Sequence, residues 1–186
     1  MGRPSNREAR RAEILSAFSR VLADHGYAGA TIAAIALEAG IAPGLVHHHF
    51  ESKDELLRGL VHDLVSRFRK RVHHYEASDD PLLAYVDGAL KLDERADLVA
   101  AKCWVGVFAE AVRNPSLFVQ MRALLDTEIG TIEQRSRGKL SPQEAGCVLA
   151  FVIGSLVLGA FAPRKTAGFA APGLRRLVAA FRAGAA

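Results

Sequence analysis

The stretch TIAAIALEAGIAPGLVHHHF (residues 31–50) predicts two short helices separated by a tight turn. Thr31 has a side chain of the type that caps a helix N-terminus, and residues 32–39 follow it as the first helix. Gly40 can take the positive φ angle of a sharp turn. Pro43 suits the first turn of a second helix that runs to the end of the stretch. This arrangement is typical of a helix-turn-helix.

Predicted helices on either side complete a compact three-helix unit. Upstream, the apolar residues from Ile14 to Leu22 recur at the spacing of one helical face, and Gly26 ends that helix. Downstream, a Ser-x-x-Glu capping box at 52–55 opens a long helix over 53–74. The second helix of a helix-turn-helix enters the major groove of DNA, where its first residues reach base edges. We therefore expect residues 1–52 to form a DNA-binding domain.

The rest of the chain shows helical periodicity and no strand-like alternation, which predicts an all-α fold. Residues 77–81 form a polar break, and Pro and Gly residues separate the segments that follow. Residues 53–186 should form a larger helical bundle for ligand binding and dimerisation, and helix 53–74 should connect it to the first domain. Further helices are expected at 81–92, 95–113, 116–136, 141–161 and 173–184.

The composition is that of an ordinary globular protein. Half of the 186 residues are hydrophobic and the formal net charge is +4. Two cysteines and an N-terminus without an apolar leader predict a cytoplasmic protein with free thiols. Residues 147–162 carry no charge, but they are short for a membrane span, so we expect a buried helix and no membrane partner.

Catalytic and cofactor-binding motifs are not recognisable in the sequence. We find no nucleophile–base set, phosphate loop or dinucleotide fingerprint, and we therefore expect neither an enzyme nor a cofactor. The run of three histidines at 47–49 raises the question of a metal site. Successive helical side chains point about 100° apart, so three in a row do not converge on one ion. We expect no metal.

Residues 11–60 carry many residue types at fixed spacing. They are Ile14-Leu15-x-x-Phe18, Gly26-Tyr27, Thr31-x-x-x-Ile35-Ala36, Ala39-Gly40-Ile41-Ala42-Pro43-Gly44, His48-His49-Phe50 and Ser52-Lys53-Asp54-Glu55-Leu56-Leu57. This set resembles the TetR family of bacterial transcription regulators. The resemblance implies a ligand-responsive, DNA-binding regulator, most often a repressor released from its operator when a small molecule binds. The alternative is a helical small-molecule-binding protein without a role at DNA.

The resemblance also implies individual DNA contacts. Thr31 and Lys53 match positions that bind phosphates, and residues 42–45 match the positions nearest the bases. Family members often have hydroxyl side chains at positions 42, 45 and 47, which this chain lacks. We therefore expect thymine methyl contacts and DNA shape to contribute to recognition. The implied DNA-binding residues are Thr31, Ala42, Pro43, Gly44, Leu45, His47, His48 and Lys53.

In the C-terminal domain, the resemblance implies an effector cavity among the middle helices and a homodimer interface on the last two. The partners are then operator DNA, a small-molecule effector and a second copy of the chain. For each cavity residue, ordinary core packing is the alternative. The candidate cavity residues are Trp104, Phe108, Phe118, Met121 and Leu125, with Asp87, Lys91 and Glu110 as polar determinants. The candidate interface residues are Leu149, Val152, Ile153, Leu156, Leu174, Leu177, Val178 and Phe181.

Overall fold

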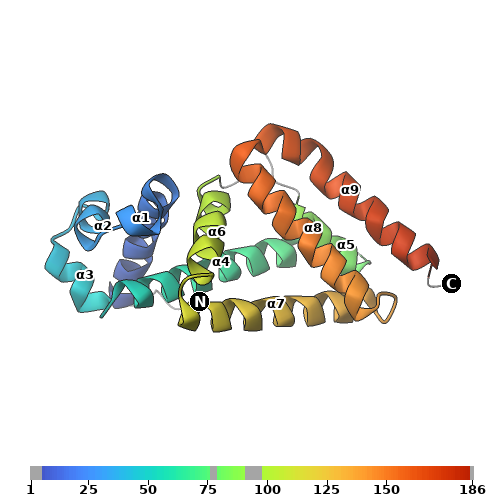
Figure 1. Ribbon diagram of the computed structural model, residues 1–186, viewed down its shortest axis with the longest axis horizontal. Helices are drawn as coiled ribbons and strands as arrows, with labels where there is room; N and C mark the ends of the chain where they lie inside the picture. Colours follow the sequence, from blue (N-terminus) through green and yellow to red (C-terminus); the bar gives the residue numbers. More distant parts are fainter. Residues whose placement is uncertain (1–5, 76–78, 91–97, 185–186) are drawn as a thin grey trace.

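The computed structural model describes residues 6–75, 79–90 and 98–184, and these residues form helices and no strands. The short N-terminal helices lie at one end of an elongated molecule and the last two helices lie at the other (Figure 1). The expected all-α fold is confirmed. The helices are α1 (Asn6–Gly29), α2 (Ile32–Ala39), α3 (Pro43–His49), α4 (Lys53–His74), α5 (Pro81–Leu90), α6 (Leu98–Ala111), α7 (Pro115–Ser136), α8 (Pro142–Phe161) and α9 (Pro163–Gly184).

Local interactions set the helix ends in the N-terminal unit. The Thr31 hydroxyl oxygen accepts a hydrogen bond from the backbone N–H of Ala34 at 3.1 Å and so caps α2. Gly40 follows α2 with φ 65°, and Pro43 begins α3, as predicted. Gly26 departs from helical geometry (φ 68°, ψ 177°), so the first helix breaks there, as predicted, and a short helical piece after the break extends α1 to Gly29.

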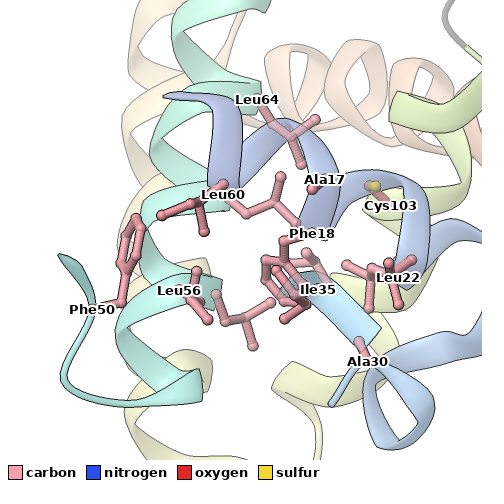
Figure 2. Packing of buried hydrophobic residues seen from close by; sticks show 14 of the residues in the cluster. Ala17, Phe18, Leu22, Ala30, Ile35, Phe50, Leu56, Leu60, Leu64 and Cys103 are labelled. Atoms are coloured by element: carbon pink, nitrogen blue, oxygen red, sulfur yellow. The ribbon is translucent and has the colours of Figure 1, made fainter. Parts of the chain in front are cut away.

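A first hydrophobic core joins α1, α2 and α4 and continues onto α6. Figure 2 shows Phe18 of α1, Ile35 of α2 and Leu56 of α4 within this cluster, with Cys103 of α6 at one side. None of these four side chains has exposed surface. Burial of a large apolar side chain stabilises a fold by about 1.5–3 kcal/mol. Because α6 belongs to this cluster, the three-helix unit is packed onto the rest of the chain.

A second core fills the other end of the molecule, between α5, α7, α8 and α9. Leu82, Ile132 and Leu174 are fully buried in it. Where α5 crosses α4, a Cβ atom on Gly88 would lie 2.4 Å from the Cα atom of Val72. A glycine at this position therefore permits the close approach of the two helices. Since Val72 belongs to the second core, α4 contributes to both.

The course of α9 differs from the prediction. The helix begins at Pro163 rather than at residue 173, and it runs through Pro172. Proline and glycine in this segment indicated a break, because both residue types disfavour helix interiors. Thr166 and Ala170 nevertheless lie buried in this first part of α9. Tertiary packing along the bundle therefore outweighs the weak helix propensity of the segment.

α8 is long and apolar enough to cross a membrane, judged by length and composition alone. Buried core helices of soluble proteins satisfy the same criterion. Here the helix packs against α6, α7 and α9, and Ala145 and Val148 have no exposed surface. α8 therefore buries one face within the bundle, but only 33% of its apolar window is buried, so the expectation of a buried helix is met in part within the single chain.

Two ion pairs attach α9 to α5. Arg175 donates from Nε and Nη2 to Asp87 Oδ1 at 3.0 and 2.5 Å, and Asp87 is only 8% exposed. Arg182 donates to the two carboxylate oxygens of Asp80 at 2.5 and 3.0 Å. The Asp80 carboxylate also accepts a hydrogen bond from the backbone N–H of Leu82 at the start of α5. The hydrogen bonds from Arg182 are the main cause that lowers the pKa of Asp80 to about 2.

Acid is expected to weaken the attachment of α9. Because the pKa of Asp80 is lower in the folded than in the unfolded chain, its stabilising effect is complete above about pH 4 and is lost as the pH falls toward 2. Asp80→Asn should therefore lower the free energy of unfolding at pH 7 by about 1 kcal/mol, a modest value because the pair is partly exposed. The substitution should also make the free energy of unfolding less dependent on pH between pH 4 and pH 2.

Urea unfolding at several pH values measures both effects. Asp126→Asn, at an exposed position of α7, serves as the matched control and should behave like the unchanged chain. Equal acid sensitivity of Asp80→Asn and the unchanged chain would contradict the assignment.

Candidate DNA-binding surface and effector cavity

α3 exposes one face and buries the other. Residues 42–44 at its start are exposed, as are His47 and His48 one turn further on. Val46 has no exposed surface and His49 is 9% exposed, so both belong to the protein interior. The structure therefore brings the predicted base-reading positions together on the solvent side, while His49 lies in the core.

The exposed face of α3 is poor in hydrogen-bonding groups. Its first residues are Ala42, Pro43 and Gly44, and Leu45 beside them is half-buried. The imidazoles of His47 and His48 are its polar side chains, and each can donate or accept hydrogen bonds. Among the described residues, no group of three His, Cys, Asp or Glu side chains could hold a metal ion. Chemically, this face suits apolar contact with thymine methyl groups better than bidentate contact with guanine.

Arg11 fixes the end of α3 against α1 and α4. Its guanidinium donates to the carbonyl oxygen of His49, pairs with Glu55 at 3.0 Å and lies 4.0 Å from the centroid of the Phe50 ring. Hydrogen bonds from the backbone of Glu51 and from Arg11 lower the pKa of Glu55, which keeps this pair charged. Burial and then nearby positive charges lower the pKa of His49, so its imidazole is neutral near pH 7.

Of the two residues predicted to bind phosphates, Thr31 has an exposed side chain, whereas the ammonium of Lys53 is bound to Tyr27. Thr31 is exposed, and its hydroxyl has a proton to donate while the oxygen caps α2. The ammonium of Lys53 donates to the carbonyl oxygen of Tyr27 and lies 4.0 Å from the centroid of its ring. Burial lowers the pKa of Lys53. In this structure, Tyr27 thus holds the Lys53 ammonium by a hydrogen bond and a cation–π contact.

Hydrogen bonds through Asp54 link Tyr27 to Asn114 at the start of α7. The Tyr27 hydroxyl donates to Asp54 at 2.8 Å, and Asn114 Nδ2 donates to the same carboxylate at 3.5 Å. Asn114 also caps α7 by accepting from the N–H of Leu117. Burial and the adjacent Asp54 raise the pKa of Tyr27, so its hydroxyl remains protonated. The sequence did not reveal this network, because its members are distant along the chain.

A cavity of about 60 Å³ lies between α4, α5, α6, α7 and α8. Four aromatic side chains line it. The rings of Trp104 and Phe108 stack at 5.7 Å, and those of Phe68 and Tyr85 meet edge to face at 5.6 Å. The carboxylate of Glu128, only 8% exposed as a residue, lines the same space. An apolar cavity with a few polar groups is typical of a small-molecule site.

Four of the five residues predicted for the effector cavity line it, and one does not. Phe118 is 53% exposed in the first turn of α7, so the prediction for this residue is wrong. The buried face of α7 contains Leu117, and the side chain of Phe118 points about 100° further round the helix. The predicted residues that do line the cavity are Trp104, Phe108, Met121 and Leu125.

Glu128 and Tyr85 provide polar groups inside the cavity. The Tyr85 hydroxyl donates to one carboxylate oxygen of Glu128 at 3.4 Å. Arg69 Nη2 lies 3.5 Å from the other oxygen, and its own side chain is largely exposed. Burial, followed by the charge of Glu128, raises the pKa of Tyr85, which therefore stays a neutral donor. The cavity thus contains a negative charge next to aromatic rings.

The polar residues that we expected in the cavity lie elsewhere or are not described. Asp87 pairs with Arg175 of α9, and Glu110 lies near Lys53, where its charge partly opposes the lowering of the Lys53 pKa by burial. Lys91 lies outside the described residues. Sequence reasoning missed Glu128, because a single carboxylate in a helical pattern reads as a solvated position. Its three-turn spacing from Leu117 along the buried face of α7 was the available signal.

Most residues predicted for the dimer interface are buried within the single chain. Leu174 and Val178 have no exposed surface, and Leu149 and Val152 have 7% and 3%. The prediction of a dimer contact is therefore wrong for these four residues. Their apolar faces pack against other helices of the same chain and are not available to a second copy. The α8 residues that line the cavity are Leu149, Val152, Ile153 and Leu156. The α9 residues in or against the second core are Leu174, Leu177, Val178 and Phe181.

A different face of α8 is open to solvent. Cys147, Gly154, Leu158 and Phe161 follow one another at helical spacing, and the last two are 52% and 77% exposed. On the adjacent α9, Phe169 is 43% exposed. We call these five residues the α8–α9 stripe. Large apolar side chains grouped on a surface indicate an interaction site.

Comparison with known sequences agrees with the helix-turn-helix at the N-terminal end of the chain. Residues 14–60 match the family described as "Bacterial regulatory proteins, tetR family". The HTH-type transcriptional regulator BetI of Escherichia coli O17:K52:H18 is 32% identical over 162 residues, which cover 81% of this chain and 82% of that protein. The regulator of the same name from Stenotrophomonas maltophilia is 33% identical over 119 residues, or 61% of this chain and 60% of its own.

Solved structures of transcriptional regulators have the same fold. One from Rhodococcus sp. Rha1 superposes with a TM-score of 0.81 at 25% identity, over 94% of this chain and 96% of its own. Another, from Saccharomonospora viridis in complex with choline, has a TM-score of 0.76 at 22% identity, over 92% and 96%. The helix-turn-helix, the exposed face of α3 and these relatives agree with one another. The chain therefore belongs to the TetR family and is a helix-turn-helix transcriptional regulator.

Proposed function

We propose that this regulator is a homodimeric, cytoplasmic repressor that leaves its operator when a small molecule occupies the cavity. The observation that carries the proposal is the position of α6. One side of this helix lines the cavity with Trp104 and Phe108, and the other packs against α1 of the DNA-binding unit. In functional terms, residues 1–52 read DNA, while residues 53–186 bind the effector and the second subunit. The role is regulatory and not catalytic.

At the operator, α3 lies in the major groove with residues 42–45, His47 and His48 toward the base edges. Thr31 and Lys53 bind backbone phosphates on either side of it. The exposure of these α3 side chains supports the assignment. Lys53 reaches a phosphate by leaving Tyr27 or by sharing its three N–H donors between the two.

The effector carries a small cationic group with apolar surface. Aromatic rings attract cations through their negative faces, and Glu128 places a carboxylate beside four of them. The regulator of the same fold from Saccharomonospora viridis holds choline, which is such a cation. The small volume of the cavity, about 60 Å³, favours a metabolite with few heavy atoms.

Effector binding reaches the DNA-binding unit through α6. The Cys103 thiol donates to the carbonyl oxygen of Ser19 on α1 at 3.1 Å. A Cβ atom on Gly106 would already touch Leu22, at 3.6 Å. A ligand against Trp104 displaces α6, and close-packed interiors transmit such displacements. The ligand thereby favours a state in which the two α3 helices of the dimer have a different separation.

Release from DNA by a cation tests the function directly. The DNA segment immediately upstream of the coding sequence is titrated with protein in a gel-shift assay, and choline is added to the complex. Because Trp104 is the one tryptophan in the chain, its fluorescence reports binding at the cavity. We expect release and fluorescence change at the same choline concentration. Glu128→Gln should raise that concentration about tenfold, as for the loss of one charge-assisted contact.

The exposed Asp126→Asn is the control for Glu128→Gln and should leave the midpoint unchanged. Failure of the protein to bind this DNA, or fluorescence change without release, would overturn the proposed function.

Loss of the Lys53 charge should weaken binding to every operator sequence alike. Each phosphate contact contributes about one unit to the slope of log affinity against log salt concentration. Lys53→Met should therefore lower the slope by about 1, whereas Lys70→Met, at an exposed position of α4, should not change it. Fluorescence anisotropy between low and moderate salt measures the slope. An unchanged slope in Lys53→Met would show that this ammonium makes no phosphate contact.

The α8–α9 stripe is the proposed dimer interface. Leu158→Glu places a charge at its centre and should produce a monomer in light scattering at micromolar concentration, since an unpaired charge in an apolar interface is costly. The Cys147 thiol should then react faster with a maleimide, because the partner no longer covers it. Val112→Glu, at a residue 79% exposed in the turn after α6, is the matched control and should remain dimeric. Dimeric Leu158→Glu would place the interface elsewhere.

A further inference from the structure

A second lobe adjoins the effector cavity, between α4, α6 and the end of α8. We call it the arginine lobe; its volume is about 40 Å³, and it is lined by Leu64, Arg67, Arg71, Leu98, Trp104 and Leu156, among others. The cavity described above, the aromatic lobe, shares Arg71, Trp104 and Leu156 with it. Because three side chains line both, the two lobes are immediate neighbours.

The charges that line the two lobes differ. In the part of the chain that the structure describes, the charged side chains of the arginine lobe are Arg67 and Arg71, one helical turn apart on α4. Arg67 pairs with Asp63 at 2.9 Å, and Arg71 Nε donates to the carbonyl oxygen of Gly88 at 3.3 Å. A guanidinium has five N–H donors, so an arginine that is already paired can still bind an oxyanion.

In the aromatic lobe, the same Arg71 lines the space that contains Glu128. A simple cation bound there is attracted by the carboxylate and the rings, but it also has a guanidinium as a neighbour. A negative group on the ligand, placed toward Arg67 and Arg71, offsets this repulsion. The charge distribution of the combined cavity therefore fits a ligand with a positive and a negative end.

We propose that the preferred effector is a zwitterion whose ammonium end occupies the aromatic lobe and whose carboxylate binds Arg67 and Arg71. This inference rests on the proposed function, since it takes the cavity as the effector site. It goes further in assigning the second lobe to an anionic group, which choline lacks. The two adjoining lobes require the two charges to lie a few bonds apart.

Fluorescence titration of Trp104 in the full-length protein tests the proposal. The probes are tetramethylammonium, choline, glycine betaine, 4-trimethylammoniobutanoate and 5,5-dimethylhexanoate, in which an uncharged tert-butyl group replaces the trimethylammonium group of the fourth probe. We expect at least one of the two zwitterions to bind tenfold or more tightly than tetramethylammonium. Arg67→Met should remove most of this advantage, and Arg67→Lys, which keeps the charge but loses the planar fork, should retain part of it. Lys70→Met is the control and should keep the full advantage.

The outcomes separate this proposal from the proposed function. If choline and tetramethylammonium bind and release DNA but neither zwitterion binds more tightly, the arginine lobe does not take a carboxylate and only the present inference fails. The same conclusion holds if Arg67→Met folds, as judged by circular dichroism, and keeps the full preference. If no ammonium compound binds or releases DNA, the cationic effector of the proposed function fails. Binding of 5,5-dimethylhexanoate alone would contradict the ammonium end and would overturn the zwitterion proposal.

Discussion

The packing of α4 into two separate cores is the constraint on which the rest of the structure depends. Its first half contributes Leu56, Leu57, Leu60 and Leu64 to the core of the DNA-binding unit, and Val72 near its end lies in the core of the C-terminal bundle. The cavity and the arginine lobe both lie along the part between. One helix therefore packs against the DNA-binding unit, lines the proposed effector site and crosses α5, and close packing couples these three regions.

Sequence reasoning succeeded where local chemistry determines the structure. The cap at Thr31, the left-handed Gly40 and the start at Pro43 are local features, and the helix-turn-helix follows from them. It failed at α9, where Pro172 indicated a break and packing of the preceding turns imposed a helix instead. The failure has a physical cause: local propensities are small compared with the burial of several side chains in a core.

The candidate sites also differ in how well the sequence predicted them. The exposed positions of α3 were predictable because the motif fixes which residues face away from the core. For the cavity and the dimer interface, periodicity identified apolar faces without saying what each face meets. Leu149 and Val152 were thus assigned to a partner subunit although they line the subunit's own cavity and core. The Tyr27–Asp54–Asn114 network, which joins α1, α4 and α7, leaves no local signature at all.

In the proposed homodimer, the apolar surface of α3 has a consequence for how sensitively DNA binding by the two α3 helices is controlled. A reader with few hydrogen-bonding side chains gains little free energy at a half-site, so occupancy of the operator depends on avidity. Once one subunit is bound, the second meets its half-site at a high effective concentration, but only if the spacing matches. Weak binding of each α3 to its half-site therefore makes operator binding sensitive to the separation of the two α3 helices. A small change in that separation removes the avidity, and the affinity of one subunit for one half-site is then too low to keep the protein on DNA.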